Sequence, residues 1–511
     1  MKIKYIHIVV IITITLLTSC NDDILYQDNP NQQTSDQFWK TEEDAIMGIN
    51  AVYSALQDVG TFGRWHTYIY DCRSDEVYNK SPWTELQNYT KFVHPNYNFE
   101  TNMFTWWQMY VTVYRSNQVL DNVPDIQMDE DLKKRILAEA KFLRALTFFH
   151  LGTMYGNIPL VLKESSPEDR PEQNTQEEVY QKIIEDLIEL YPDLPHSYPE
   201  SEVGRATQGA ARALLGKVYM QQHQWEDAAT EFEAVFDSPA GYSLTPNYKD
   251  NFTDLNENNE ESIFEVQFIE GEAGCRDCPG GAEGNERAIF FAPAGIGWNE
   301  GHFRPWVLDE FLKETTISGE TDPRLAVTMF YNKALYDPAD PDTLVYGTGY
   351  ITQFGSNSTL TWFRKYQSDY KQDFEGWQSG INFRLIRLAD IYLLYAEAMN
   401  EMGETSIAID YIDYVRERSN IASLLTLQAN WTQEEIRQQL QDHERVLELA
   451  SEGTRWFDLV RWGWLDNSTD LEKIRERDED FDYFEVGKSI LLPIPTHEVD
   501  VNPKLLQNPG Y

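Results

Sequence analysis

A helix-pair pattern that occurs twice constrains the fold more than any other feature of the sequence. In this pattern, Leu-Gly-x₂-Tyr on one helix is followed by Ala-x₃-Phe on the next, as in tetratricopeptide repeats. The matching positions are Leu215, Gly216, Tyr219, Ala228 and Phe232 in the first copy, and Ala396, Gly403, Ala408 and Ile412 in a less complete second copy. Small residues at the contact let paired helices approach closely. The sequence therefore predicts stacked helix pairs, and the alternative is two ordinary helical hairpins.

Helix signals also occur outside these two copies. Apolar residues recur at three- and four-residue steps from Glu139 to Tyr155, and Gly156 follows as a stop signal. Two Thr-x-x-Glu capping boxes, at residues 175–178 and 432–435, each open a further predicted helix. We therefore expect a mainly α fold in which tetratricopeptide-type helix pairs form the scaffold.

The middle of the chain has a different pattern. From about residue 242 to residue 380, loops rich in Gly, Pro, Asn and Trp replace the helical periodicity. Phe264, Val266 and Phe268 alternate along residues 262–268, which predicts a strand. Loops this long are usually functional. We expect a helical region at residues 20–240 and a second region at 241–511, in which the irregular residues 241–380 bind the ligand.

The first twenty residues have the pattern of an export signal that ends in a lipid attachment site. Lys2 and Lys4 form a short basic segment, and the ten residues 8–17 are apolar except for two threonines. A spanning helix needs about 20 apolar residues, so this run fits the core of a signal peptide instead. A small residue precedes Cys20, where polar sequence begins. We expect residues 1–19 to be removed and Cys20 to be acylated; the alternative is an ordinary secretory signal.

The charge of the chain restricts its partners. The formal net charge is −42. A field of this sign repels the phosphates of nucleic acids and disfavours other acidic ligands. We therefore expect no nucleic-acid partner, whereas neutral ligands remain open.

Three cysteines remain besides Cys20, namely Cys72, Cys275 and Cys278. Cys275 and Cys278 form a Cys-Arg-Asp-Cys motif among several glycines, which indicates a loop. Outside the cytoplasm this spacing favours a small structural disulfide, and the alternative is a free pair. Zinc would need two further ligands at suitable spacing, and the neighbouring sequence offers none.

The sequence contains no recognisable catalytic motif. It has no Gly-x-Ser-x-Gly elbow, no His-Glu-x-x-His pair and no phosphate-binding loop, and its nine histidines are scattered. Asp254, Asn256, Asn258 and Glu265 fall near the ligand positions of a calcium loop, but Asn259 stands where that loop requires glycine. We expect a binding protein rather than an enzyme, with no cofactor and no assigned metal.

Several blocks, taken together, resemble the SusD/RagB family of surface nutrient-binding lipoproteins. The blocks follow the family order and span nearly the whole chain after Cys20. They are AEAKFLRA (138–145), YGNIPL (155–160), GRAT (204–207), RLIRLADIYLLYAEA (384–398), the run from ER at 444–445 to DLVRWG at 458–463, and the ending from PIP (493–495) to QNPGY (507–511). The resemblance implies a SusD-like fold.

The resemblance also implies a function. Members of this family bind oligosaccharides, or peptides in some cases, and act as a hinged lid on a SusC-like TonB-dependent transporter in the outer membrane. We therefore expect a lipid-anchored protein that faces the cell exterior and delivers oligosaccharides to such a transporter. Two alternatives remain open: a peptide-binding RagB-like member, and a protein-interaction scaffold without a small ligand. The resemblance assigns buried arginines such as Arg144, Arg387 and Arg455 to holding helices together.

The family's ligand surface comes from the loop after the first helices and from the irregular middle region. Sugar rings pack their C–H faces on flat aromatic side chains, while polar side chains bind their hydroxyl groups. The first loop, residues 75–100, and the middle region offer as candidates Tyr78, Trp83, Asn88, Trp298, Asn299, Arg304 and Trp306, with Trp362 or Trp377 as further possibilities. Trp83 and Trp298 rank first because Gly, Pro or Asn flanks each of them. The alternative for any of these tryptophans is packing in a satellite core.

Overall fold

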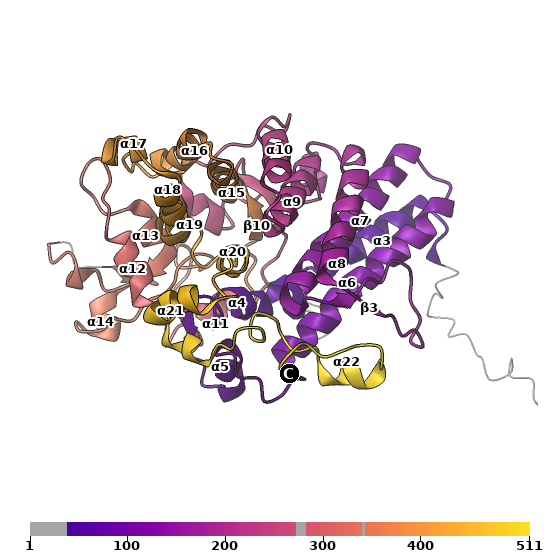
Figure 1. The fold of residues 1–511 in the computed structure, drawn as a ribbon, viewed down its shortest axis with the longest axis horizontal. Helices are drawn as coiled ribbons and strands as arrows, with labels where there is room; N and C mark the ends of the chain where they lie inside the picture. Colours follow the sequence, from indigo (N-terminus) through magenta and orange to yellow (C-terminus); the bar gives the residue numbers. More distant parts are fainter. Residues whose placement is uncertain (1–37, 272–282, 340–342) are drawn as a thin grey trace, which may run out of the picture.

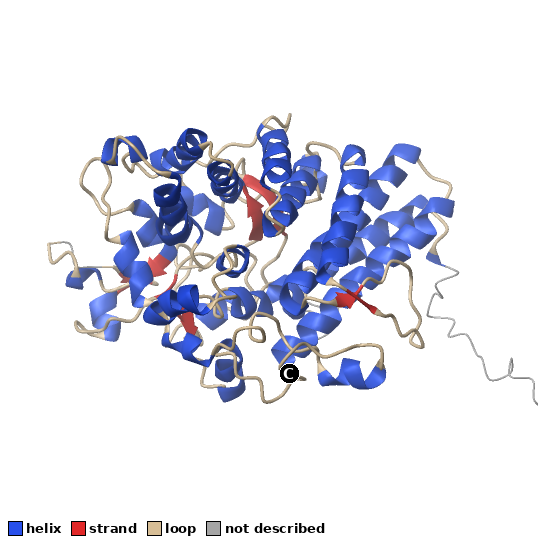
Figure 2. Ribbon diagram, in the orientation of Figure 1, coloured by secondary structure: helices blue, strands red, loops and turns tan. Residues whose placement is uncertain are grey.

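The computed structural model describes residues 38–271, 283–339 and 343–511. Helices dominate these residues, and the strands within them form five sheets of only two short strands each (Figures 1 and 2). The prediction of a mainly helical fold with an irregular, strand-containing part is confirmed. The division of the chain at residues 240 and 241 stays a prediction.

Eight helices form a continuous array in which each helix packs on the next. In order they are α3 (Glu42–Ala55), α6 (Glu100–Asn122), α7 (Glu130–Tyr155), α8 (Gln176–Leu190), α9 (Gln208–Gln221), α10 (Trp225–Phe236), α15 (Leu388–Glu401) and α16 (Thr405–Arg418). Figure 1 shows this array from the indigo helices on one side to the orange α16 on the other. The irregular middle region is inserted between α10 and α15 and therefore does not interrupt the array.

The remaining elements are shorter. The helices among them are α4 (Trp65–Tyr70), α5 (Thr84–Thr90), α11 (Arg287–Phe291), α12 (Pro305–Phe311), α13 (Pro323–Thr328), α14 (Tyr350–Phe354), α17 (Leu424–Leu427), α18 (Gln433–Gln439), α19 (Arg445–Leu449), α20 (Arg455–Arg461), α21 (Ser468–Arg477) and α22 (Thr496–Val501). The strands pair as β1 (Val77–Asn79) with β5 (Gly301–Phe303), β2 (Ile158–Pro159) with β3 (Gln173–Asn174), β4 (Ser262–Val266) with β10 (Phe383–Arg387), β6 (Met329–Phe330) with β9 (Trp362–Phe363), and β7 (Leu344–Val345) with β8 (Thr348–Gly349).

The helix-pair prediction is confirmed at α9 and α10 and at α15 and α16. A Cβ atom on Gly216 would lie 2.3 Å from the buried ring of Phe232 on the partner helix, so only glycine allows this close approach. Ala396 and Ala408 are completely buried at the equivalent contact between α15 and α16. Both predicted capping boxes are present, at the first residues of α8 and α18.

The predicted strand at residues 262–268 is confirmed as β4, which ends two residues early. β4 pairs antiparallel with β10, and Phe264 lies opposite Ile386. The strand ends because the amide of Phe268 donates to the side chain of Asn382 at 2.7 Å instead of continuing the ladder. This pair of strands fixes the beginning of the middle region to the beginning of α15.

Buried arginines bind carboxylates of distant segments, as the resemblance implied. Arg144 pairs with Asp186 at 2.9 Å, and Arg455 pairs with Asp75 at 2.7 Å. Arg387, which is 1% exposed, contacts three glutamates, namely Glu261 at 2.8 Å and Glu448 and Glu452 at 2.6 Å. Charges buried to this extent are tolerated because each has hydrogen-bonded partners of opposite sign.

A buried histidine makes stability depend on pH. His443 lies in the short helix η8 (Leu440–Glu444), 2.7 Å from Glu310 of α12 and 3.6 Å from Glu314. Burial disfavours the imidazolium, but these carboxylates, together with Glu444, prevail and raise the pKa of His443 from 6.5 to about 9. The stabilisation is therefore complete below the unfolded value and is lost as the pH rises through the folded value.

We expect the free energy of unfolding to fall between pH 6.5 and about pH 9, by about 3 kcal/mol at most, through this one residue. The measurement is urea unfolding at a series of pH values across this range, on the unsubstituted chain and on His443→Gln. The variant lacks the titrating group, so the difference between the two proteins isolates its contribution. Parallel stability curves for the two proteins across this pH range would show that His443 does not contribute.

Candidate ligand-binding surface

The first predicted loop folds into β1 and α5, so its candidate residues are partly enclosed. Trp83 precedes α5 and is half-buried, with its ring centroid 6.5 Å from that of Trp65. Tyr78 lies in β1 and stacks on His302 with centroids 5.3 Å apart. Asn88 lies within α5. These three residues therefore do not form one exposed surface by themselves.

β1 and β5 hold the two predicted loops together. Tyr78 lies opposite His302 in this antiparallel pair. Beside it, the amide of Lys80 donates to the carbonyl oxygen of Glu300 at 2.9 Å, and the hydroxyl of Ser81 donates to the Glu300 carboxylate at 2.9 Å. Burial raises the pKa of Glu300, and the hydroxyl of Tyr68 also donates to its carboxylate. The loop that contains Trp83 and the loop that contains Trp298 are therefore joined by the β1–β5 pair and by hydrogen bonds to Glu300.

Two exposed tryptophans lie side by side at the edge of the middle region. Trp298 is 48% exposed and Trp377 is 53% exposed, and their ring centroids are 5.8 Å apart. Phe290 of α11 stacks on Trp298 at 6.0 Å with the two rings 25° from parallel. The amide of Trp298 donates to the carbonyl oxygen of Ile289 at 2.9 Å, which ties the loop to α11. We call Trp298, Trp377 and Phe290 the aromatic platform.

Asn299 shapes the loop that presents Trp298. Its φ angle of 60° lies in the left-handed region, which asparagine adopts more readily than most residues. Its Oδ1 accepts a hydrogen bond of 2.6 Å from Nε1 of Trp362, a residue with no exposed surface. Of the two further tryptophans considered from the sequence, Trp377 is therefore the exposed one, and Trp362 belongs to the interior.

Arg64 lies beneath the platform, and no sequence pattern indicated its role. Its guanidinium carbon lies 3.9 Å from the ring centroid of Trp65 and 3.7 Å from that of Phe290, in the geometry of cation–π contacts. Arg64 is 6% exposed and pairs with Glu286 at 3.5 Å. Its buried Nε has no hydrogen-bond partner among the described residues. Through Trp65 and Arg64, the half-buried Trp83 is connected to the platform.

Arg304 and Trp306 are two residues apart in the sequence, and neither has an exposed side chain: Arg304 is buried and Trp306 is half-buried. Arg304 is 8% exposed and pairs with Asp480 at 2.5 Å and with Asp478. Burial raises the pKa of Asp478 to about 7, and the charge of Arg304 opposes this shift. Nε1 of the half-buried Trp306 donates to the carbonyl oxygen of Asp75 at 2.6 Å. In this structure both side chains are occupied by contacts within the protein.

The remaining predicted residues include some that the structure does not describe. Cys20, Cys275 and Cys278 lie outside the described residues, so the lipid site and the disulfide stay predictions. Within residues 38–271, 283–339 and 343–511, no group of three or more His, Cys, Asp or Glu side chains is arranged to hold a metal ion. In the calcium-like segment, Asp254 binds Lys371 at 2.6 Å. Over the same described ranges, no helix is both long enough and apolar enough to span a membrane.

The fold of the chain matches solved structures over more than nine-tenths of its length. Among solved structures, a SusD superfamily protein from Bacteroides vulgatus is 28% identical, with a TM-score of 0.81, over 93% of this chain and all of the other. A laminarin-binding SusD-like protein is 29% identical, with a TM-score of 0.74, over 92% of this chain and all of the other.

Sequence relatives give the same result. A SusD-like protein of Formosa agariphila is 28% identical over 98% of this chain and 99% of its own length. The starch-binding protein SusD of Bacteroides thetaiotaomicron is 24% identical over 84% of this chain and 82% of its own length. A family model described as starch-binding and associating with the outer membrane matches residues 24–220, and the model of the SusD family matches residues 237–511. The chain therefore belongs to the SusD family.

Proposed function

We propose that this protein is a cell-surface lipoprotein that binds neutral oligosaccharides on the aromatic platform. The observation that carries this proposal is the pair of adjacent, half-exposed rings of Trp298 and Trp377, supported from beneath by Phe290. Large exposed aromatic rings are costly to leave in water and typically mark binding surfaces. The relatives named for binding laminarin and starch support a glycan as the ligand.

The charge of the protein narrows the glycan class. A net charge of −42 raises the energy of bringing an anionic polysaccharide to the surface, whereas a neutral glucan meets no such barrier. The three platform side chains carry no charge, and the guanidinium of Arg64 beneath them is buried between Trp65 and Phe290. The proposed ligand is therefore a neutral oligosaccharide that packs its ring faces on the two tryptophans.

The proposed location is the outer face of the outer membrane, where acyl chains on Cys20 anchor the protein. There it delivers its ligand to a SusC-like TonB-dependent transporter. Support comes from the small residue before Cys20, where polar sequence begins, and from the description of the amino-terminal family model. More than one acyl chain gives stable attachment, since each buried CH₂ contributes about 0.8 kcal/mol. An anchored binding protein raises the local concentration of ligand beside its transporter.

Glycan binding is tested by calorimetric titration of the purified full chain with laminarin and starch oligosaccharides, alongside a peptide library. We expect Trp298→Ala to weaken binding by about tenfold, which is about 1.4 kcal/mol, because one of the two stacking surfaces is lost. Trp107→Ala is the matched control, since Trp107 is a 37% exposed tryptophan of α6 outside the platform. The proposal is contradicted if Trp298→Ala and Trp107→Ala bind every glycan with equal affinity. It is also contradicted if the unsubstituted chain binds peptides and no glycan.

The lipid anchor is tested by cell fractionation. We expect Cys20→Ala to move the protein from the membrane fraction to the soluble fraction while glycan binding is retained, because only the acylation site changes. Cys72→Ala is the matched control, since this buried cysteine is free and lies far along the chain from the anchor. Recovery of Cys20→Ala in the outer-membrane fraction of cells that lack the transporter would rule out the lipid as the anchor.

A further inference from the structure

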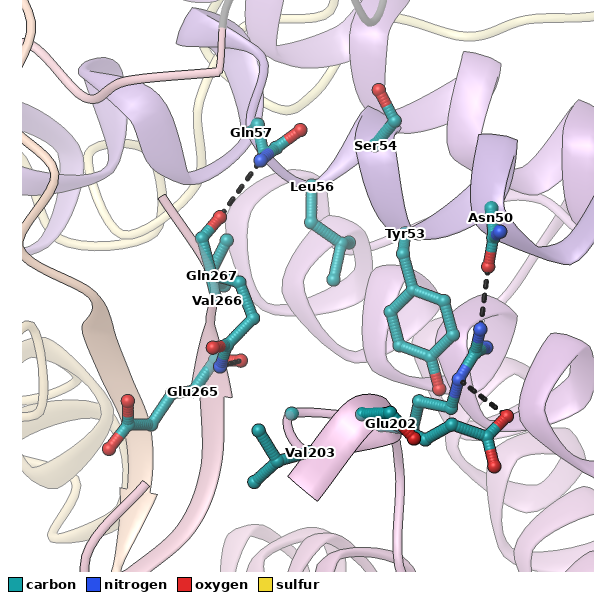
Figure 3. Close-up of a pocket in the computed structure, with 13 residues that line it drawn as sticks. Asn50, Tyr53, Ser54, Leu56, Gln57, Glu202, Val203, Glu265, Val266 and Gln267 are labelled. Carbon is teal, nitrogen blue, oxygen red and sulfur yellow. Dashed lines mark hydrogen bonds and ion pairs between the residues drawn. The ribbon is translucent and has the colours of Figure 1, made fainter. Parts of the chain in front are cut away.

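A pocket whose lining includes none of the platform residues lies between the end of α3, the segment 201–205 and the end of β4. Its volume is about 290 Å³, close to the lower end of the range for small-molecule pockets, about 300 Å³. Figure 3 shows the ring of Tyr53 on one side and Gln267 on the other, with Leu56 above and Val203 below the space between them. Val203 is 48% exposed, so the pocket opens to solvent beside it.

A glycine shapes the wall of this pocket. Gly204 has a φ angle of 91°, and a Cβ atom there would lie 2.6 Å from the side chain of Gln267. Gln57 also lines the pocket, and its Nε2 donates to the carbonyl oxygen of Gln267 at 2.9 Å (Figure 3). The pocket is therefore formed by close contacts between three segments that are far apart in the sequence.

Several uncharged polar groups that line the pocket are left without partners. Asn50, Ser54, Gln57 and Ser201 are among its lining residues, and Nδ2 of Asn50, Oγ of Ser54, Oε1 of Gln57 and Oγ of Ser201 make no hydrogen bond within the described parts of the chain. Together they offer donors and acceptors beside the ring of Tyr53. This combination of an apolar face with a few polar groups is typical of sites for small neutral molecules.

The charged side chains of the pocket are already paired. Arg205 donates to Glu139 at 2.9 Å and to Asn50 at 2.7 Å. Glu202 accepts two hydrogen bonds from Arg135, at 2.8 and 2.9 Å. The third charged side chain, Glu265, pairs with Arg384 at 3.1 Å. No charge among these residues is left for an ionic ligand, which favours a neutral one.

We propose that this pocket is a second binding site, which takes one neutral, hydroxylated ring such as a terminal sugar unit. The ring packs on Tyr53, and its hydroxyl groups bind the uncommitted groups of Asn50, Ser54 and Gln57. The sugar class of the ligand rests on the proposed function, whereas the site itself uses none of the platform residues. The helix η2 (Val59–Gly63) connects Gln57 to Arg64, so one continuous segment lines the pocket and supports the platform.

The test measures binding of D-glucose and of laminaritriose to the full chain by calorimetry and by saturation-transfer NMR. The platform is removed first, with Trp298→Ala and Trp377→Ala together, and we expect weak binding of both sugars to remain. In that background, Val203→Phe fills the pocket and should weaken the remaining affinity by at least about tenfold. Val203→Ala keeps the pocket open and should change it by less than about threefold, whereas Ser54→Ala, which removes one hydroxyl partner, should weaken it by about three- to tenfold.

The outcomes separate the two proposals. The second site is supported if the variant without the platform still binds sugar, and if Val203→Phe removes this binding while Val203→Ala preserves it. Loss of all binding once the platform is removed overturns the second site and leaves the proposed function intact. Remaining binding that Val203→Phe does not change also overturns it, because the sugar then lies elsewhere. If the unsubstituted chain binds neither sugar, the second site is overturned for this ligand class, and the platform is judged by the longer glycans alone.

Discussion

Replacing Arg387 with methionine is expected to destabilise the protein by about 3–5 kcal/mol, the usual cost of removing one partner from a buried ion pair. Arg387 is 1% exposed and holds Glu448 and Glu452 at 2.6 Å. Burial opposes ionisation of Glu448, yet Arg418 and Arg387 hold its pKa well below its usual value. Without Arg387, the carboxylate of Glu448 either remains charged with fewer partners or takes up a proton at a cost in free energy.

The measurement for Arg387→Met is urea unfolding at neutral pH, with Arg437→Met as the control. Arg437 also forms a bidentate ion pair, with the Glu401 carboxylate at 2.7 and 2.9 Å, but its side chain is 31% exposed. An exposed pair of this kind contributes about 0–1 kcal/mol. Similar losses in the two variants would show that burial of the Arg387 network does not set its contribution.

Truncation of both platform tryptophans should have the largest effect on ligand binding. We expect Trp298→Ala combined with Trp377→Ala to weaken oligosaccharide binding by at least about 30-fold, or about 2 kcal/mol. The ring centroids lie 5.8 Å apart, so truncation of one ring also removes a neighbour of the other. The combined loss should therefore differ from the sum of the single losses, as expected for residues in contact.

A double-mutant cycle measured by calorimetry gives both quantities. Thermal unfolding of the same variants is the control, because both tryptophans are about half exposed and their truncation should leave the core intact. A double variant that binds as well as the unsubstituted chain would exclude the platform as the principal site.

The scaffold was predictable because its signals are local. The close contact of Gly216 with Phe232 follows from residue spacing within about one helix pair, and the capping boxes at Thr175 and Thr432 depend on residues three positions apart. Helical periodicity and capping are properties of short segments. An interruption of this periodicity was likewise visible in the sequence between the two helix pairs, where the structure has short helices and strands.

The candidate site was only partly predictable because its contacts are long-range. Trp298 was identified from the composition of its loop, whereas its neighbour Trp377 lies 79 positions further along and was only a secondary candidate. Arg304 looked like a residue available to bind a hydroxyl group, but it pairs with Asp480, 176 positions away. Arg64 gave no periodic or compositional signal, since its two aromatic neighbours are brought together only by the fold.

The most direct test of the proposed function is a crystal structure of the protein with a bound laminarin or starch oligosaccharide. Sugar rings packed against Trp298 and Trp377, with Phe290 beneath them, are the predicted result. An oligosaccharide bound at another surface, with both tryptophan rings left uncovered, would contradict it.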